Sequence, residues 1–279
     1  MTILEELVLK LKDTNSQEIH LQTNGIIRGF NEDGWTVHGS FKEDPQSLIE
    51  KCQIECIKMN LRLDPVSPEC SGTLMSHGIR FYIAIPPLVR GYPMIAIRKQ
   101  QLDQIRLEDF DIEARDLKHL ILSLQSYSNF FIFGPTGSGK TSFMTSLLKK
   151  VPVNEKVLII EDQDEIPIHE PHWDKFYVTR ADQDHEGEVD WMMALKASLR
   201  VRPNRIVLAE LRLKDMEILE KAIHLGFQSV FATFHANSLE DARCQLEKVG
   251  IDAHSSIIMV GMRPRVNLKP SIYIPNLID

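Results

Sequence analysis

The sequence of 279 residues has no apolar run long enough to cross a membrane. A membrane-spanning helix needs about 20 apolar residues, and the most apolar stretch, residues 120–133, is interrupted by polar side chains. The first ten residues, MTILEELVLK, lack the positive lead and apolar block of a signal peptide. We therefore expect a cytoplasmic protein that reaches a membrane only by recruitment.

The sequence also has few cysteines and no excess of basic residues. The four cysteines, Cys52, Cys56, Cys70 and Cys244, include no C-x-x-C pair, which argues against a zinc ribbon and fits a reducing compartment. We expect Cys52 and Cys56 to be buried thiols on one helix face. Acidic residues outnumber basic ones by 39 to 32, and there is no long basic tail. We therefore expect no direct binding to nucleic acid.

The composition that remains is that of a folded protein, with 43% hydrophobic and 25% charged residues. Hairpin turns at Asn24-Gly25 and Asp33-Gly34 predict a small α+β domain over residues 1–100. After a polar linker at 101–112, helices and strands alternate over 113–279, which is typical of an α/β fold with a parallel sheet. We expect residues 251–279 to form a short, proline-interrupted tail.

The local patterns place the individual elements. In the first domain, they predict helices near 4–11 and 45–60 and strands at 18–22, 26–30, 34–37, 79–85 and 94–98. In the second, they predict helices near 113–124, 140–150, 191–199, 214–225 and 239–250, and strands at 129–133, 157–160, 176–179, 206–209 and 229–233.

The segment GPTGSGKT at 134–141 has the pattern G-x-x-x-x-G-K-T, between an expected strand and an expected helix. Glycines let successive backbone N–H groups curl around an oxyanion, and the helix N-terminus adds partial positive charge. A lysine at this position reaches the β- and γ-phosphates of ATP, and the next hydroxyl binds Mg²⁺. The predicted nucleotide-binding residues are Gly134, Pro135, Thr136, Gly137, Ser138, Gly139, Lys140, Thr141 and Ser142.

Acidic residues and a histidine follow other expected strands. Glu210 ends the apolar strand 206–209, at the sheet edge where α/β ligands bind, so it is a candidate to polarise water or hold a metal-bound water. Alone, this stretch would favour an ordinary surface glutamate. Four carboxylates within 161–165 repel each other, and either a bound metal or a neighbouring arginine would offset this; a solvated acidic loop is equally consistent. His235 is either a sensor of the γ-phosphate or a structural side chain.

Together these segments resemble the type II/type IV secretion ATPase family, the hexameric traffic ATPases of conjugation, protein secretion and type IV pili. IRFYIAIPP, MIAIRK and EIHLQTNGIIRGFNEDGW are similar to its N-terminal domain, so the resemblance covers about residues 18–250. It implies a RecA-like P-loop NTPase domain preceded by a small PAS-like α+β domain. Four segments look like the family's Walker A, Asp box, Walker B and His box, in that order: GPTGSGKT (134–141), IIEDQDEI (159–166), LKASLRVRPNRIVLAELR (195–212) and ATFHANSLEDARCQLE (232–247).

The resemblance also implies roles for single residues. Glu165 and Glu210 would orient water and, with Thr141, hold Mg²⁺, while His235 would couple the γ-phosphate to movement. Arginines that reach the nucleotide in relatives match Arg80, Arg98, Arg200 and Arg202; a surface or interdomain ion pair is the alternative for each, most of all for Arg202. Asn204 stands where relatives usually have Asp.

The function implied is an ATPase that uses ATP and Mg²⁺ as a homo-hexameric ring and powers a type IV secretion or conjugation machine at the inner membrane. It would associate peripherally with that membrane and contact secretion or pilus components there. A type IV pilus retraction or assembly motor and a nucleotide-gated, non-hydrolysing scaffold remain alternatives. A P-loop kinase or a nucleic-acid translocase is a further alternative, although no second substrate motif is evident.

Overall fold

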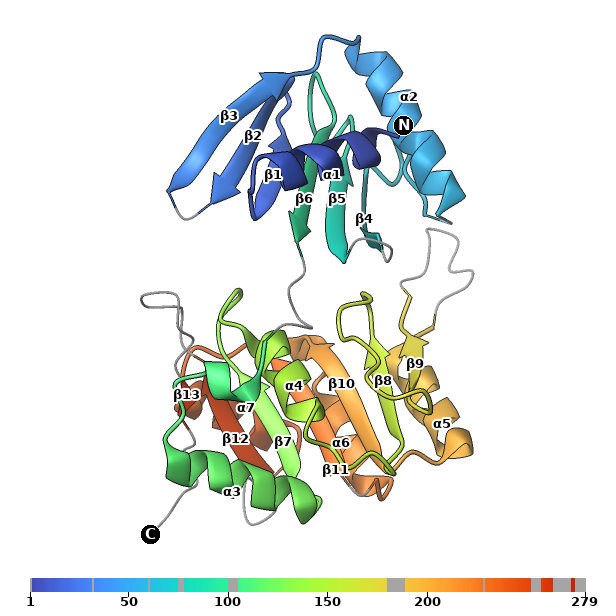
Figure 1. Ribbon diagram of the computed structural model, residues 1–279. Helices are drawn as coiled ribbons and strands as arrows, with labels where there is room; N and C mark the ends of the chain where they lie inside the picture. Colours follow the sequence, from blue (N-terminus) through green and yellow to red (C-terminus); the bar gives the residue numbers. More distant parts are fainter. Residues whose placement is uncertain are drawn as a thin grey trace. The chain divides into compact units, whose positions relative to one another are not determined.

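The computed structural model describes residues 2–31, 33–59, 61–74, 78–99, 105–179, 189–227, 229–251 and 257–262, and the backbone of 272–273. The chain divides into two compact units, Met1–Gln101 and Leu102–Asp279 (Figure 1). Each unit encloses its own hydrophobic clusters. No helix in the described ranges is long and apolar enough to span a bilayer.

The first unit is an antiparallel sheet with two helices on one face (Figure 1). Its six described strands lie in the order β3-β2-β1-β6-β5-β4. Alternate strand residues such as Ile19 and Leu21 are buried beneath the helices, as the period of two requires. The elements are α1 (Ile3–Asp13), β1 (Glu18–Leu21), β2 (Ile26–Asn31), β3 (Gly34–Ser40), α2 (Pro45–Lys58), β4 (Glu69–Leu74), β5 (Ile79–Ala84) and β6 (Met94–Lys99).

Both helices of this unit begin where the sequence predicts. Thr2 and Glu5 form a capping box at α1, with each side chain bonded to the other residue's backbone N–H. Asp44 caps α2. Cys52 and Cys56 are buried on α2, which confirms the expectation for these two thiols. Strand β4 was not expected, because its sequence ECSGTL has little of the β-branched and aromatic character of a typical strand.

The second unit confirms the expected α/β class. Its described strands form one sheet in the order β13-β12-β7-β11-β10-β8-β9, and all pair in parallel except β12 with β13. The elements are η2 (Leu107–Asp109), α3 (Ala114–Gln125), β7 (Asn129–Phe133), α4 (Lys140–Leu148), β8 (Val157–Glu161), β9 (Asp174–Tyr177), α5 (Trp191–Val201), β10 (Arg205–Leu211), η3 (Leu213–Asp215), α6 (Glu217–His224), β11 (Ser229–Phe234), α7 (Leu239–Lys248), β12 (Ile257–Met262) and β13 (Ile272–Tyr273).

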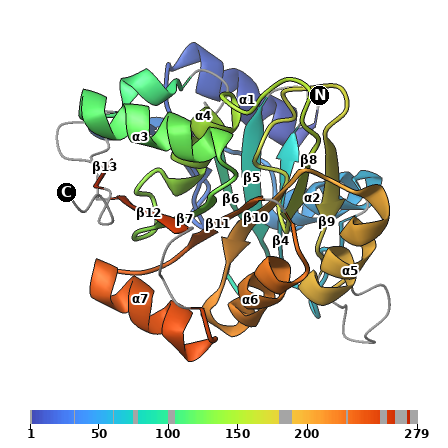
Figure 2. The same ribbon diagram turned by 90° about the horizontal axis from the view of Figure 1, so that it is seen from below.

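Helices cover both faces of this sheet, which is why its central strands are buried throughout. Helices α3 and α4 lie on one face, and α6 and α7 lie on the other (Figure 2). The described part of the expected linker also belongs here. Leu107 and Phe110 are buried in the cluster beneath α3 and α4, and the Phe110 ring meets the Phe143 ring edge-on at 5.1 Å. Residues 105–112 therefore pack as part of the second unit.

The largest difference from expectation is β12, within the segment expected to be a tail. All six of its residues are buried, and it pairs in parallel with β7. Its sequence, IIMVGM, is the short continuous apolar run of a strand covered on both faces. β7 therefore lies between β11 and β12 rather than at an edge.

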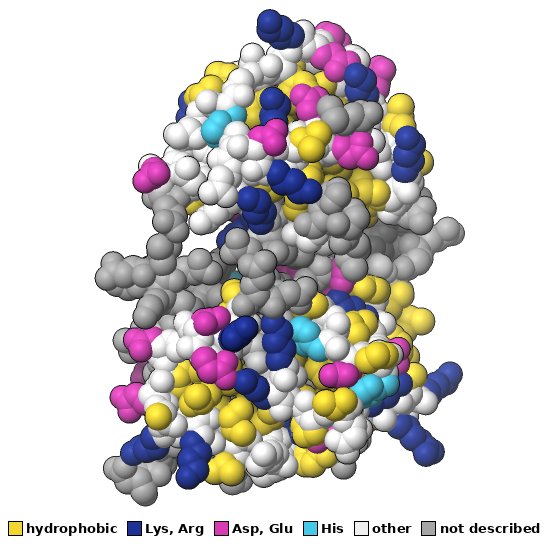
Figure 3. Space-filling view, viewed as in Figure 1, with side chains coloured by type: hydrophobic (Ala, Val, Ile, Leu, Met, Phe, Trp, Pro, Cys, Tyr) yellow, Lys and Arg dark blue, Asp and Glu magenta, His cyan; other side chains and the backbone are white. Residues whose placement is uncertain are grey.

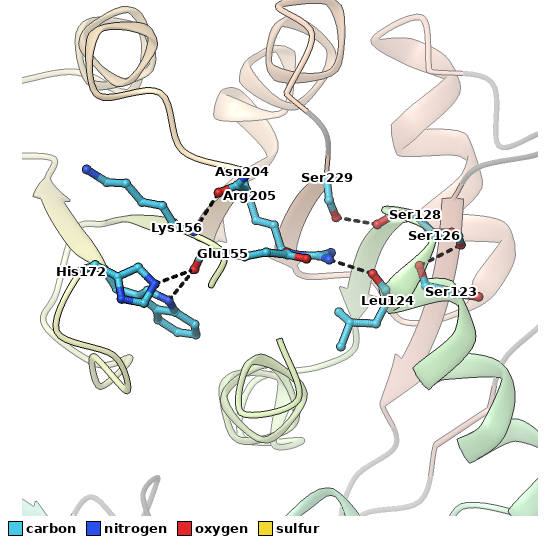
Figure 4. Close-up of polar contacts among 11 residues, drawn as sticks. Ser123, Leu124, Ser126, Ser128, Glu155, Lys156, His172, Asn204, Arg205 and Ser229 are labelled. Carbon is cyan, nitrogen blue, oxygen red and sulfur yellow. Dashed lines mark hydrogen bonds and ion pairs between the residues drawn. The ribbon is translucent and has the colours of Figure 1, made fainter. Parts of the chain in front are cut away.

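A buried polar network fixes the amino edge of the sheet (Figure 4). Arg205, the first residue of β10, is completely buried; its Nε donates to Glu155 Oε2 at 2.5 Å and its Nη2 to the Leu124 carbonyl at 2.8 Å. The guanidinium carbon lies 4.5 Å from the Tyr127 ring centroid. The neighbouring Asn204 accepts the Lys156 backbone N–H at 2.8 Å through Oδ1. Asn204 thus provides a side-chain oxygen here, as an aspartate would.

Candidate active site

The glycine loop joins β7 to α4, as the sequence predicts. Gly139, in the left-handed region with a φ of 91°, precedes α4, whose first intrahelical bond runs from the Phe143 N–H to the Gly139 carbonyl at 2.9 Å. A Cβ at Gly134 would lie 2.5 Å from the Met262 carbonyl oxygen, so β12 leaves room only for glycine there. The loop thus directs the N-terminus of α4 toward the carboxyl edge of the sheet, where partial positive charge attracts anions.

Lys140 is 5% exposed and lies among groups that accept hydrogen bonds. Its Nζ donates to the carbonyls of Gly134 at 3.2 Å and Pro135 at 3.1 Å. Burial lowers the pKa of Lys140, while the charges of Glu210 and Glu165 oppose that shift. The ammonium is therefore held inside its own loop by weak neutral acceptors, which anionic phosphate oxygens could replace.

Glu210, on β10, and His235, directly after the neighbouring strand β11, lie beside this lysine. His235 Nε2 lies 2.9 Å from Glu210 Oε1, and His235 Nδ1 lies 3.3 Å from Lys140 Nζ. Glu210 Oε1 is itself 3.9 Å from Lys140 Nζ. The geometry fits a neutral imidazole that donates to Glu210 and accepts from Lys140. Both Glu210 and His235 are about half exposed, at 45% and 44%, so an incoming ligand or water can reach them.

Two further contacts support this group. The Thr233 hydroxyl on β11 donates to the Ala209 carbonyl, one residue before Glu210. Gln245 on α7 donates from Nε2 to the His235 carbonyl at 3.0 Å and to Asp241 Oδ1 at 3.1 Å. No sequence pattern indicated Gln245, because its partner is a backbone oxygen ten positions earlier in the chain.

Cations of the chain lie beside carboxylates at the end of β8 and in the acidic loop that follows it. Glu161 is 1% exposed, and its Oε1 accepts from Lys175 Nζ at 2.6 Å. Lys175 also pairs with Asp164, and Arg212 pairs with Asp162 at 3.5 Å. Cations of the chain itself, a lysine as well as the arginine considered from the sequence, therefore offset the repulsion. Among the carboxylates of this loop, Glu165 is the one whose charge raises the pKa of Lys140.

Of the arginines assigned from the resemblance, Arg200 and Arg202 belong to the same unit as the glycine loop but do not lie beside it. Arg200 and Arg202 are exposed at the end of α5, immediately before β10 begins. β10 begins at the amino edge, whereas the glycine loop follows the carboxyl end of β7 in the same parallel sheet. Arg200 therefore does not join Lys140 within this unit, and a role at a nucleotide would require the loop of another copy of the chain.

Arg80 and Arg98 belong to the first unit. They are register partners on β5 and β6 and therefore lie on the same face of that sheet. Arg98 is 66% exposed and pairs with Glu18 at 3.3 Å between Nε and Oε1. Within this unit, Arg98 thus forms the surface ion pair that was the alternative to a nucleotide contact.

The residues present fit a bound phosphate. Ser138 is fully buried in the loop, and in the described residues its Oγ has no hydrogen-bond partner. A buried hydroxyl of this kind normally has a partner, so a ligand oxygen would satisfy it. Thr141 and Ser142 form the first turn of α4, half-buried. The described ranges contain no group of three metal-binding side chains.

The fold and the loop define a class: a P-loop α/β protein, with the loop after a central parallel strand and polar side chains from two neighbouring strands around its lysine. Within that class, the chain belongs to the family described as "Type II/IV secretion system protein", whose profile matches residues 69–271.

Proteins with similar sequences are named as conjugal transfer or type IV secretion system proteins. A putative conjugal transfer protein of Mycobacterium tuberculosis is 28% identical over 218 residues, which are 74% of this chain and 61% of that protein. Conjugal transfer protein TrbB of Rhizobium radiobacter is 29% identical over 220 residues, 75% of this chain and 64% of TrbB. VirB11, a type IV secretion system protein of Bartonella quintana, is 26% identical over 276 residues, 85% of this chain and 77% of VirB11. The chain thus spans less than two thirds of the first two relatives.

Solved structures share the fold. The pilus retraction motor PilT with bound ADP superposes with a TM-score of 0.68 at 18% identity, covering 99% of this chain and 84% of PilT. The ATPase DotB of Legionella pneumophila superposes with a TM-score of 0.65 at 16% identity, covering 98% of this chain and 80% of DotB. At this identity the likeness establishes architecture alone.

Proposed function

We propose that the protein hydrolyses ATP with Mg²⁺ and drives a type IV secretion or conjugation machine. One observation supports the chemistry: Lys140 at the start of α4, Glu210 of β10 and His235, which directly follows β11, meet within hydrogen-bonding and ion-pair distance at the carboxyl edge of one sheet. Family membership and the names of the conjugal transfer and secretion relatives support the process. The second unit would be of the RecA-like type and the first of the PAS-like type.

Each residue of the site would have its own role in ATP hydrolysis. The loop amides and Lys140 would bind the phosphates, with Lys140 exchanging its carbonyl partners for phosphate oxygens. Thr141, Glu165 and Glu210 would hold Mg²⁺, which would neutralise phosphate charge when bound. Glu210, exposed and bonded to His235, would orient the attacking water. A change at the phosphate would reach β11 through His235 and α7 through Gln245.

Assembly would complete the site. A homo-hexameric ring would let Arg200 meet a neighbouring copy's loop, and closure of the two units would bring Arg80 and Arg98 to the nucleotide. Guanidinium forks stabilise charge on a transferring phosphoryl group. On the face shown in Figure 3, Lys and Arg side chains are interspersed with Asp and Glu rather than gathered in one basic patch. From the family and the names of its relatives we propose peripheral association with inner-membrane secretion or pilus proteins, from the cytoplasm. The excess of acidic over basic residues, 39 to 32, supports the further proposal that the protein makes no direct contact with nucleic acid.

Phosphate release by the purified protein tests this function. We expect the wild type to turn over ATP, and Glu210→Gln to bind ATP with little change and to release phosphate far more slowly. Glu217→Gln is the matched control, because Glu217 is 74% exposed on α6 in a surface pair with Lys221. Mass in solution with and without ATP and Mg²⁺ shows whether rings have formed. Equal, near-zero rates for assembled wild type and Glu210→Gln would favour the nucleotide-gated scaffold.

A further inference from the structure

Lys175 on β9 is a buried cation that no motif assigned. Its side chain is 8% exposed, and it pairs with two carboxylates of the acidic loop, Glu161 and Asp164. Burial alone would lower the pKa of Lys175, but the two carboxylates outweigh burial and raise it. A lysine that stays charged in such a place determines where the neighbouring carboxylates point.

Glu161 connects Lys175 to the backbone of the acidic loop. While Oε1 binds Lys175, Oε2 accepts the N–H groups of Glu165 and Ile166, each at 3.1 Å. Ile166 is fully buried in the core, which anchors the far end of the loop. The carboxylate of Glu161 therefore closes residues 162–165 into a turn, and Lys175 fixes the orientation of that carboxylate.

The acidic side chains of this loop, although close in sequence, interact with different cations. Asp164 turns to Lys175 and Asp162 to Arg212, while the charge of Glu165 acts on Lys140 in the phosphate loop. Without a fixed cation, Asp164 could compete with Glu165 for the same position, and the backbone carrying Glu165 would lose its Glu161 anchor.

We propose that Lys175 is a positioning residue of the active site: by pairing with the carboxylates of Glu161 and Asp164, it fixes the loop backbone that carries Glu165. The inference rests on the proposed ATPase function for its effect on rate. It concerns orientation, because Lys175 pairs with the acidic loop rather than with the glycine loop, and nucleotide affinity should therefore not depend on it.

The test compares Lys175→Met and Lys175→Arg with wild type. We expect Lys175→Met to lower kcat about 10- to 100-fold, the usual loss when an outer partner of a site residue is removed, with ATP affinity by calorimetry unchanged. Lys175→Arg should recover most of the rate, because a guanidinium can also bind two carboxylates. Lys156→Met is the matched control: Lys156 precedes β8 and pairs at 2.7 Å with Asp174, the residue before Lys175 on β9, so this pair joins the same two strands without involving the acidic loop.

A second readout does not depend on hydrolysis. Amide hydrogen exchange at Glu165 and Ile166 reports the two bonds to Glu161, and we expect faster exchange at both in Lys175→Met but not in Lys156→Met. If Lys175→Met does not fold, the double variant Glu161→Gln/Lys175→Met removes both buried charges and is measured instead; its rate should stay low, because Asp164 still lacks its cation.

The outcomes separate the two proposals. An active wild type with a Lys175→Met variant of equal kcat would overturn the positioning role and leave the ATPase function intact. An assembled but inactive wild type would overturn the function, and exchange would then decide the inference: unchanged exchange at Glu165 and Ile166 in Lys175→Met would overturn it, and accelerated exchange would support it.

Discussion

Replacing Arg205 by methionine tests how the amino edge of the second unit is held. The change removes a completely buried guanidinium and leaves Glu155, 8% exposed, without its cation. It also removes the bond to the Leu124 carbonyl and the packing on Tyr127. The backbone carbonyl of Glu155 accepts two further bonds at 3.0 Å, from His172 Nε2 and from the Trp173 ring N–H, which hold the Glu155 backbone in place. Figure 4 shows His172 beside this carbonyl.

The magnitude follows from these contacts. Breaking a buried ion pair by removing one partner costs about 3–5 kcal/mol, and a lost hydrogen bond from a charged donor costs about 1.5–3 kcal/mol. Because such terms are not additive, we expect a total loss of about 4 kcal/mol in the free energy of unfolding of the second unit. A unit of this size loses about 2–4 °C in Tm per kcal/mol, so its transition should fall by roughly 8–16 °C.

Scanning calorimetry resolves the transition of the second unit, and two controls interpret it. Arg205→Met/Glu155→Met removes both charges and should recover most of the loss, since an apolar pair of similar volume often replaces a buried ion pair at little cost. Lys150→Met breaks the exposed pair with Glu108 and should cost at most about 1 kcal/mol. If the single and double Arg205 variants are equally destabilised, the reasoning from an uncompensated charge is wrong.

Three further predictions concern the phosphate loop and the first unit. Lys140→Ala should abolish ATP binding because the phosphates lose their ammonium; unchanged affinity in calorimetry would contradict this. Arg98→Ala should slow turnover more than it lowers Tm, since its partner Glu18 offers only a surface pair; a large fall in Tm with normal specific activity would instead support a structural role. Burial raises the pKa of Glu55, whose carboxylate accepts the first N–H groups of α1. The folded state thus keeps a proton that the unfolded state loses near pH 4.5, so stability falls as pH rises through the raised pKa. Glu55→Gln lacks this dependence, and its free energy of unfolding in urea, relative to wild type, should increase over that window; a constant difference would argue against it.

The sequence predicted the parts of the site that depend on local pattern and topology. The glycine loop has fixed spacing, and strands of a parallel sheet bring their carboxyl ends to one edge. That rule is enough to expect Glu210 and His235 near Lys140, although their motifs lie far apart in the chain.

Other features could not be predicted, because their partners are set by packing. Lys175 stands before the stretch expected as a strand, and nothing in its neighbourhood indicates a buried cation. Arg205 lies in a basic run within the segment that resembles Walker B, and this run does not indicate which arginine is buried. The structure shows that Arg205 is completely buried. The apolar run of β12 was visible, but the prolines and charges after it favoured a tail over a strand.

The position of β12 links the phosphate loop to a late part of the chain. Residues 134–141 leave the ribosome more than a hundred positions before 257–262, yet β7 gains its second neighbour only from those residues. During synthesis, β7 would have only β11 beside it, and the carbonyl of Met262 would not yet limit the space around Gly134. Competence to bind a nucleotide should therefore arise only after residues 257–262 have emerged from the ribosome.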